Sequence, residues 1–118
     1  MVVIVDDEAV LRNLFELVLQ QRGHDVATAA SHDEASEVCR RLHPDVVTLD
    51  MLMPQGSGLE LIRTLRAETP GVRILAVSGN SDLLPAAIDA GASLTLAKPF
   101  SPVQLIEAVE GLLDGERP

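Results

Sequence analysis

Aromatic and basic side chains are scarce in this chain of 118 residues. Phe15 and Phe100 are its only aromatic residues, and nine lysines and arginines face eighteen aspartates and glutamates, which gives a formal net charge of −9. Binding to DNA or RNA generally requires a basic surface, and base stacking requires aromatic side chains. We therefore expect this domain to make no direct contact with nucleic acid.

Cysteines and long apolar runs are also nearly missing. Cys39 is the only cysteine, which excludes an internal disulfide and favours a reducing, cytoplasmic location. No apolar run approaches the roughly 18 residues that cross a membrane, and no signal-peptide pattern follows Met1, so we expect no membrane partner. With 47% hydrophobic residues the chain has enough apolar surface for one core, and we expect residues 1–118 to form one domain.

Short apolar runs and helical patterns alternate along the chain. The apolar runs predict strands at residues 1–5, 24–29, 45–49, 72–77 and 94–97. Helical spacing predicts helices at residues 8–22, 31–42, 59–68, 84–90 and 102–113. In the first helix, one apolar face consists of Val10, Leu14, Leu17 and Val18. Strict alternation of strand and helix predicts an α/β fold with three layers, in which helices cover both faces of a five-stranded parallel sheet.

Polar residues end four of the five predicted strands. They are Asp6 and Asp7 after the first strand, Asp50 after the third, Ser78 after the fourth and Lys98 after the fifth. Any one of them alone would be an ordinary loop residue. Because ligands of parallel sheets bind at the carboxyl ends of the strands, we expect these side chains to converge on one site.

The chemistry of this set is that of phosphoryl transfer. Clustered carboxylates repel one another, and Mg²⁺ compensates, because it prefers oxygen ligands and often joins carboxylates to a phosphate. A carboxylate can attack phosphorus and form an aspartyl phosphate. Asp50 is the best nucleophile, since Asp6 and Asp7 are adjacent and better placed as a metal pair. Lys98 would neutralise the phosphoryl group and the Ser78 hydroxyl would bond one of its oxygens.

Four short motifs carry a family resemblance. They are Val5-Asp6-Asp7-Glu8, Leu49-Asp50-Met51-Leu52-Met53-Pro54, Val77-Ser78-Gly79 and Lys98-Pro99-Phe100. Each motif alone is weak, but all four occur in order at suitable spacing and span essentially the whole chain. The sequence therefore resembles the receiver domain of two-component response regulators, with the chemotaxis regulator as the nearest type.

The resemblance implies a fold, partners and an output. The fold would be flavodoxin-like, with strand order 2-1-3-4-5. The phosphoryl donor would be a phosphohistidine on a histidine kinase or phosphotransfer protein, and the signal would pass to a downstream protein target or an output domain. Many receivers form homodimers or bind targets through the fourth helix, fifth strand and fifth helix, where Leu83 and Leu84 would contribute if exposed. Such a domain catalyses only its own phosphorylation and dephosphorylation.

The resemblance also assigns roles to single residues. Asp50 would be the phosphoacceptor, and Ser78 and Lys98 would contact the phosphoryl oxygens. The Mg²⁺ ligands would be Asp7 directly, Asp6 through water, Asp50, and the backbone carbonyl of Leu52. The Lys98–Pro99 peptide bond is expected to be cis.

Some positions depart from the family pattern. Thr95 stands three residues before Lys98, where an aromatic residue usually swings inward on activation, so the aromatic half of that switch is missing. The loop Gln55–Gly58 lacks the acid that commonly precedes its final glycine. Leu52 and Asn80 flank the expected water route to the phosphoryl group. We hypothesise that the apolar Leu52 shields the acyl phosphate from hydrolysis.

Two other functions remain open. A Mg²⁺-dependent hydrolase would turn over an aspartyl phosphate on Asp50, but phosphatases of the haloacid-dehalogenase type normally carry a second acid two residues later, where this chain has Leu52. A degenerate receiver would act only as a binding scaffold, which the complete set of acids and Lys98 disfavours. The chain fits either a stand-alone receiver or a fragment of a larger regulator.

Overall fold

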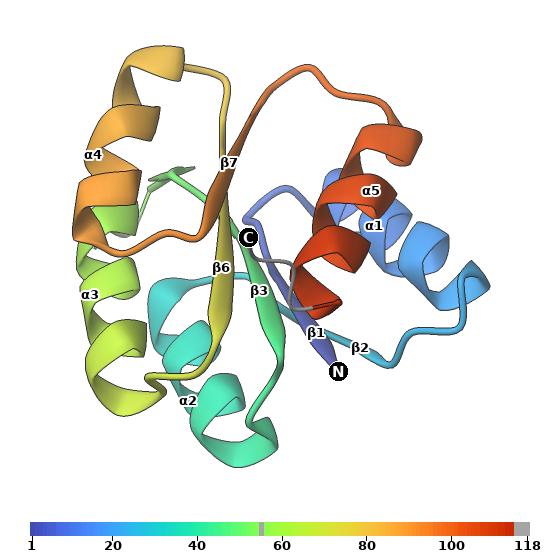
Figure 1. Cartoon of the computed structure of the whole chain (residues 1–118), viewed down its shortest axis with the longest axis horizontal. Coiled ribbons are helices and arrows are strands. Elements are labelled where there is room, and N and C mark those ends of the chain that lie inside the picture. The colour runs from blue at the N-terminus through green and yellow to red at the C-terminus, as the bar shows by residue number, and fades with distance from the viewer. Residues whose placement is uncertain (55, 115–118) are drawn as a thin grey trace.

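The computed structural model describes residues 1–54 and 56–114, and strands alternate with helices along the chain (Figure 1). The strands are β1 (Val2–Val5), β2 (Val26–Ala29), β3 (Val46–Asp50), β4 (Leu52–Met53), β5 (Gly56–Ser57), β6 (Arg73–Ser78) and β7 (Leu94–Ala97). The helices are α1 (Ala9–Gln21), α2 (His32–Leu42), α3 (Gly58–Glu68), a 3₁₀ turn η1 (Ser81–Leu83), α4 (Leu84–Ala90) and α5 (Pro102–Leu113). Within the described ranges, none of these helices has the length and apolar character to cross a membrane.

Five of the strands form one parallel sheet in the order β2-β1-β3-β6-β7. This order confirms the flavodoxin-like topology predicted from the sequence, because β4 and β5 pair only with each other. Val2 is aligned with Val26 of β2 and with Val46 of β3, so β1 is an interior strand. Figure 1 shows α1 and α5 on one face of the sheet and α2, α3 and α4 on the other, which gives the three predicted layers.

Strand β1 separates two hydrophobic cores. Its residues are all buried, and their side chains alternate between the two faces of the sheet because a strand has a period of two. Val2 and Ile4 belong to the core under α1 and α5, together with Phe15. Val3 and Val5 belong to the core under α2 and α3. A strand buried on both faces has no polar alternation, which is why the N-terminal residues form a continuous apolar run.

Helix α1 turns a different face to the core from the one its pattern suggested. The apolar face predicted from the sequence consists of Val10, Leu14, Leu17 and Val18. Val10, Leu14 and Leu17 are 79%, 42% and 52% exposed, so this prediction is wrong for three of the four. Phe15 and Leu19 are buried instead. The helix carries two overlapping apolar stripes, and the stripe with the large aromatic side chain packs against the sheet and α5.

The segment between β3 and α3 contains a small hairpin where the sequence predicted only a loop. The antiparallel pairs are Leu52 with Ser57 and Met53 with Gly56. Gln55, which belongs to the predicted loop, lies outside the described residues. Gly58 begins α3, and a Cβ atom there would come within 2.9 Å of the Cα of Met51. A side chain at position 58 would therefore clash with the backbone that directly follows Asp50.

Candidate functional site

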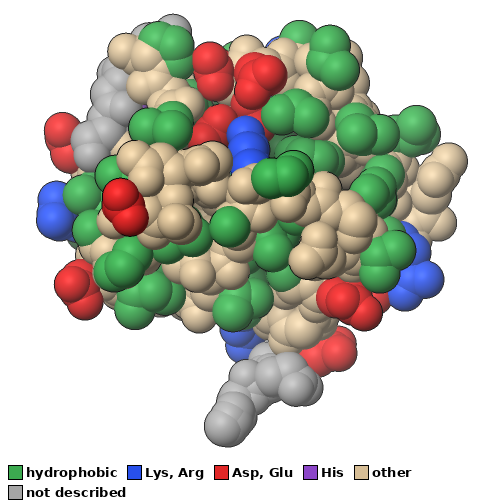
Figure 2. All heavy atoms as spheres, turned by 90° about the horizontal axis from the view of Figure 1, so that it is seen from above, with side chains coloured by type: hydrophobic (Ala, Val, Ile, Leu, Met, Phe, Trp, Pro, Cys, Tyr) green, Lys and Arg blue, Asp and Glu red, His purple; other side chains and the backbone are tan. Residues whose placement is uncertain are grey.

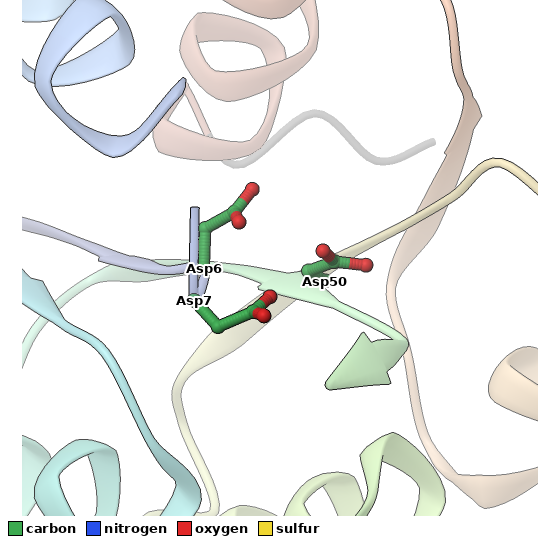
Figure 3. Close-up of side chains that lie close together, drawn as sticks. All are labelled: Asp6, Asp7 and Asp50. Atoms are coloured by element: carbon green, nitrogen blue, oxygen red, sulfur yellow. The ribbon is translucent and has the colours of Figure 1, made fainter. Parts of the chain in front are cut away.

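The carboxyl ends of β1 and β3 bring three carboxylates together. Asp6 and Asp7 follow β1, and Asp50 ends β3, the neighbouring strand. One carboxylate oxygen of each lies within 4.8 Å of the other two (Figure 3). Asp6 and Asp50 are only 3% and 5% exposed, and Asp7 is half-buried. Carboxylates so close in a buried position repel one another unless a cation compensates.

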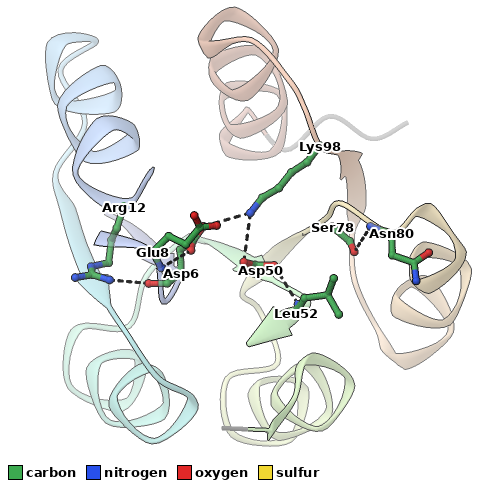
Figure 4. Close-up of polar contacts among 8 residues, drawn as sticks. All are labelled: Asp6, Glu8, Arg12, Asp50, Leu52, Ser78, Asn80 and Lys98. Atoms are coloured by element: carbon green, nitrogen blue, oxygen red, sulfur yellow. Dashed lines mark hydrogen bonds and ion pairs between the residues drawn. The ribbon is translucent and has the colours of Figure 1, made fainter. Parts of the chain in front are cut away.

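Lys98 reaches this cluster from the end of β7. Its Nζ lies 3.3 Å from Oδ2 of Asp50 and 3.6 Å from Oδ2 of Asp6 (Figure 4). Burial alone would lower the pKa of Lys98, but the negative charges of Asp50 and Asp6 outweigh burial and raise this pKa above its ordinary value. The ammonium therefore stays protonated at neutral pH. The Lys98–Pro99 peptide bond is cis, as the family resemblance implies.

Asp6 is held through its backbone and its carboxylate. Its amide donates to the Ala29 carbonyl at 3.1 Å, and its Oδ1 accepts from the Glu8 amide at 2.8 Å. Burial raises the pKa of Asp6 above its ordinary value, because the Glu8 hydrogen bond and the Lys98 charge offset burial only in part, and the charge of Asp50 raises it further. Ionised Asp6 is therefore an unfavourable state that a bound cation would relieve.

Both carboxylate oxygens of Asp50 have a partner. Oδ1 accepts a hydrogen bond from the backbone amide of Leu52 at 3.0 Å, and Oδ2 faces Lys98. The side chain of Leu52 is 53% exposed. An apolar side chain in contact with solvent therefore lies beside the carboxylate, as Figure 4 shows.

Ser78 ends β6, the strand next to β3, and is fully buried. Its hydroxyl accepts a hydrogen bond from the amide of Asn80 at 3.0 Å, and its carbonyl accepts one from the amide of Lys98 at 2.9 Å. In Figure 4 it lies on the other side of Asp50 from Asp6. The Ser78 hydroxyl thus lies at the carboxyl end of the sheet, as predicted, and its hydrogen bond is to the amide of Asn80 in the loop that follows β6.

Arg12 contacts the site, although sequence reasoning did not select it. Its Nη1 donates to the backbone carbonyl of Asp6 at 2.8 Å (Figure 4). Arg12 belongs to none of the four motifs, and arginine on a helix usually faces solvent. The one feature of the sequence that could have indicated Arg12 is its position four residues, or one helical turn, after Glu8, which directly follows Asp6 and Asp7.

An apolar groove of about 220 Å³ opens beside Lys98. Its walls come from α1, from the segment that joins β7 to α5 and from the start of α5, and they include Leu11, Leu14, Lys98, Pro99 and Pro102. The rings of Phe15 and Phe100 stack with their centroids 5.4 Å apart and join the two walls. Figure 2 looks down on the molecule and shows acidic and basic side chains together in a hollow, with hydrophobic side chains around them.

The sequence as a whole matches a known family. Residues 2–110 match the family model described as the response regulator receiver domain. The chain belongs to this family. The recognition predicted from the four motifs is confirmed.

Curated relatives of this receiver include short and long proteins. It is 35% identical to the chemotaxis protein CheY of Thermotoga maritima over 111 residues, which cover 92% of each chain. It is 34% identical to the probable transcriptional regulatory protein TcrX of Mycobacterium tuberculosis over 114 residues, which cover 95% of this chain and 49% of TcrX. The DNA-binding response regulator MtrA of the same organism is 32% identical, with 50% of its length covered. The receiver therefore spans about half the length of TcrX and MtrA and nearly all of CheY.

Solved receiver structures share the fold. The receiver domain of NtrX from Brucella abortus superposes with a TM-score of 0.92 at 29% identity, over 98% of this chain and 100% of that one. A response regulator from Thermotoga maritima superposes with a TM-score of 0.86 at 29% identity, over 97% of both chains. These likenesses confirm the predicted receiver fold over nearly the whole chain.

Proposed function

We propose that this receiver is a phosphorylation-dependent signalling switch, in which Asp50 accepts a phosphoryl group from a phosphohistidine of a histidine kinase or phosphotransfer protein. The observation that supports this most directly is the cluster of Asp6, Asp7 and Asp50 with Lys98 at the carboxyl end of the sheet. Asp50 is the best acceptor, because Lys98 lies nearest to it and the adjacent Asp6 and Asp7 are better placed as a metal pair. Beyond its own phosphorylation and dephosphorylation, we assign the domain no catalytic turnover.

The cluster fits a bound Mg²⁺. This ion prefers oxygen ligands, keeps several waters and commonly binds one or two carboxylates together with a phosphate. Asp6, Asp7 and Asp50 supply such oxygens, and we assign the backbone carbonyl of Leu52 as a further ligand. The three carboxylates, Lys98 and Mg²⁺ have formal charges that sum to zero. When bound, Mg²⁺ would neutralise the charge on the transferred phosphoryl group.

Transfer to Asp50 forms one bond and breaks another. A carboxylate oxygen of Asp50 attacks phosphorus while the P–N bond of the phosphohistidine breaks. The electron pair of that bond leaves with the imidazole nitrogen, which takes up a proton. We assign Lys98 and Ser78 to the phosphoryl oxygens, since the ammonium lies 3.3 Å from the Asp50 carboxylate and the hydroxyl ends the adjacent strand.

The donor protein has to approach Asp50 from the carboxyl end of the sheet. The apolar groove beside Lys98 continues into the exposed stripe of Val10, Leu14 and Leu17 on α1. Contiguous apolar surface next to a polar site is typical of an interaction surface. We therefore assign the donor protein to this face.

The output of the switch requires a partner outside this domain. TcrX and MtrA are regulators of transcription or DNA-binding regulators by name, and this chain matches about half of each. The net charge of −9 disfavours contact between this domain itself and nucleic acid. We propose that the signal passes, in the cytoplasm, to an output domain of a larger regulator or to a separate protein target.

The surface of α4, β7 and α5 is the face we assign to that target or to a homodimer. Ile88 and Leu94 are 47% and 40% exposed there. Leu83 packs against the core under α3, and Leu84 is half-buried. The exposed apolar residues of this face are therefore different from the two that the sequence suggested.

A small molecule that donates phosphoryl groups tests the acceptor. After incubation with acetyl phosphate and Mg²⁺, mass spectrometry should find one phosphoryl group on the wild type and none on Asp50→Asn. Asp45→Asn removes an exposed carboxylate at the opposite end of the sheet and should be labelled like the wild type. Equal labelling of Asp50→Asn contradicts the proposal. Steady release of phosphate from many phosphomonoesters would indicate a hydrolase.

Beryllofluoride, which mimics a phosphoryl group, tests the switch. To move a state from 1% to 99% of the population requires about 5.5 kcal/mol of differential stabilisation, which charge-assisted bonds to Ser78 and Lys98 would provide. With Mg²⁺ and beryllofluoride, NMR amide shifts should extend beyond the site, to the half-buried Thr95 on β7 and to α4. Shifts confined to residues around Asp50 would indicate a binding scaffold instead.

A further inference from the structure

One side chain from α1 holds the turn that carries Asp6 and Asp7. Nη1 of Arg12 donates to the carbonyl of Asp6 at 2.8 Å, and Arg12 is half-buried. Among the described residues Arg12 forms no ion pair, although the chain has eighteen acidic residues. For a guanidinium that is partly shielded from water, loss of such a hydrogen bond to a backbone carbonyl is costly, so the side chain stays at that carbonyl.

Besides Arg12, this turn is held by the Asp6 amide, which donates to the Ala29 carbonyl, and by a hydrogen bond to the Asp6 carboxylate. Glu8 is the N-cap of α1, and its side chain makes no capping hydrogen bond. The Glu8 amide instead binds Oδ1 of Asp6, the same carboxylate that would face a cation. The Arg12 contact uses the Asp6 carbonyl and leaves the carboxylate free. The Arg12 hydrogen bond therefore supports the turn both when the Asp6 carboxylate binds the Glu8 amide and when it faces a cation.

The carbonyl that Arg12 binds controls the direction of the next residue. The Asp6 carbonyl and the Asp7 amide belong to one planar peptide unit, so an anchored carbonyl fixes the whole plane. That plane, together with the φ angle of Asp7, sets the direction in which the Asp7 side chain leaves the backbone. We infer that Arg12 is a positioning residue, which holds the Asp7 carboxylate toward Asp6 and Asp50 and thereby strengthens Mg²⁺ binding. This inference rests on the metal site of the proposed function.

Charge and geometry predict opposite effects of losing Arg12. A positive charge near a cation site repels Mg²⁺, so removal of the charge alone would strengthen binding. Loss of the anchor would weaken binding, because the Asp7 carboxylate would no longer be held in place. The hydrogen bond of Arg12 is to a backbone carbonyl, so the anchor acts on the backbone.

Calorimetric titration with Mg²⁺ separates the two effects. Arg12→Gln should weaken Mg²⁺ binding about tenfold, the lower end of the effect of residues that orient metal ligands. Arg12→Lys keeps the charge and can donate one hydrogen bond, and it should weaken binding about threefold. The matched control is Arg63→Gln, because Arg63 is an exposed arginine on α3. It should stay within about twofold of the wild type.

Unchanged or tighter Mg²⁺ binding by Arg12→Gln overturns the inference. If this variant does not fold, Arg12→Lys decides: binding equal to the wild type overturns the role, and weaker binding supports it. A wild type that does not bind Mg²⁺ would overturn the proposed metal site itself, which is a different outcome.

A second readout is the Mg²⁺ dependence of labelling by acetyl phosphate. Arg12→Gln should require about tenfold more Mg²⁺ for the half-maximal rate and reach the wild-type rate at saturation. A lower rate at saturating Mg²⁺ with an unchanged Mg²⁺ requirement would contradict a positioning role.

Discussion

The two ends of the central sheet differ in how their acidic side chains are paired with basic groups. At the amino end, Asp45 is 61% exposed and pairs with the N-terminal ammonium at 3.0 Å. Also at this end, Glu110 lies 2.8 Å from Arg22 and 2.9 Å from His24, which precede β2. At the carboxyl end, three carboxylates lie together, and Lys98 pairs with two of them, Asp6 and Asp50.

The two ends therefore differ in how their acidic side chains are balanced by basic ones. The acids at the amino end have basic partners near solvent, where one ion pair contributes about 1 kcal/mol or less. The acids at the carboxyl end outnumber their partner, and two of them are buried, which lowers the stability of the fold. An arrangement that opposes stability is typical of a functional site, whereas balanced pairs are typical of a structural surface.

Substitutions of aspartate by asparagine at the two ends of the sheet should differ most strongly in their effect on Mg²⁺ affinity. Asp7→Asn should weaken Mg²⁺ binding at least about tenfold, because the neutral amide is a poorer ligand for a hard cation. Asp45→Asn, the same change at the amino end, should leave the affinity unchanged. Isothermal titration calorimetry measures both. Equal affinities of the two variants would remove the functional distinction between the ends.

The lifetime of the phosphoryl group should depend on Leu52 at the carboxyl end. Leu52→Asn should shorten this lifetime about fivefold, which corresponds to about 1 kcal/mol in the barrier, because an amide admits and orients water where the leucine excludes it. Leu94→Asn changes an exposed leucine at the amino end of β7 and should have no effect. The loss of label after removal of the donor gives both rates. An unchanged lifetime in Leu52→Asn refutes the shielding hypothesis.

Stability should respond with opposite signs at the two ends. Without Mg²⁺ at pH 7, Asp6→Asn should raise the free energy of unfolding by about 1 kcal/mol, since it removes a buried charge and keeps an oxygen for the Glu8 amide. Asp45→Asn should lower it by about 0.5 kcal/mol through loss of an exposed pair. Urea denaturation measures both values. A destabilised Asp6→Asn would show that this carboxylate supports the fold.

Acid should weaken the amino end through Glu110. Hydrogen bonds from Arg22 and then His24 lower the pKa of Glu110 from 4.5 to about 2. A lowered carboxyl pKa means that the contribution to stability is complete above pH 4.5 and is lost as the pH falls toward 2. Glu110→Gln should therefore flatten the loss of stability across this window, as measured by denaturation at several pH values. The control Glu107→Gln, on the same helix, should keep the slope of the wild type.

The sequence predicts the carboxyl end better than the amino end, for a physical reason. Asp6, Asp50 and Lys98 each follow a recognisable strand, and parallel pairing brings the ends of such strands together. The contact of Glu110 with Arg22 depends on how α5 lies against α1, which no local spacing encodes. Arg12 escaped notice for a similar reason, because its target is a backbone carbonyl.

The outward face of α1 shows a second limit of sequence patterns. Val10 and Leu14 are as apolar as a core residue, and helical periodicity does not distinguish a stripe that packs inside from one that meets a partner. The presence of Phe15 on the competing stripe decided the orientation, through packing against a distant helix. The exposed stripe borders the groove beside Lys98 through Leu14.

The order of the strands has a consequence for the chain during synthesis. Lys98 enters the site from β7, which pairs with β6 and is the last described strand to leave the ribosome. A nascent chain that ends after β6 already contains Asp50 and its acidic neighbours, but it has neither the ammonium nor the second wall of the groove. The site is thus complete only after β7 has been synthesised and has paired with β6.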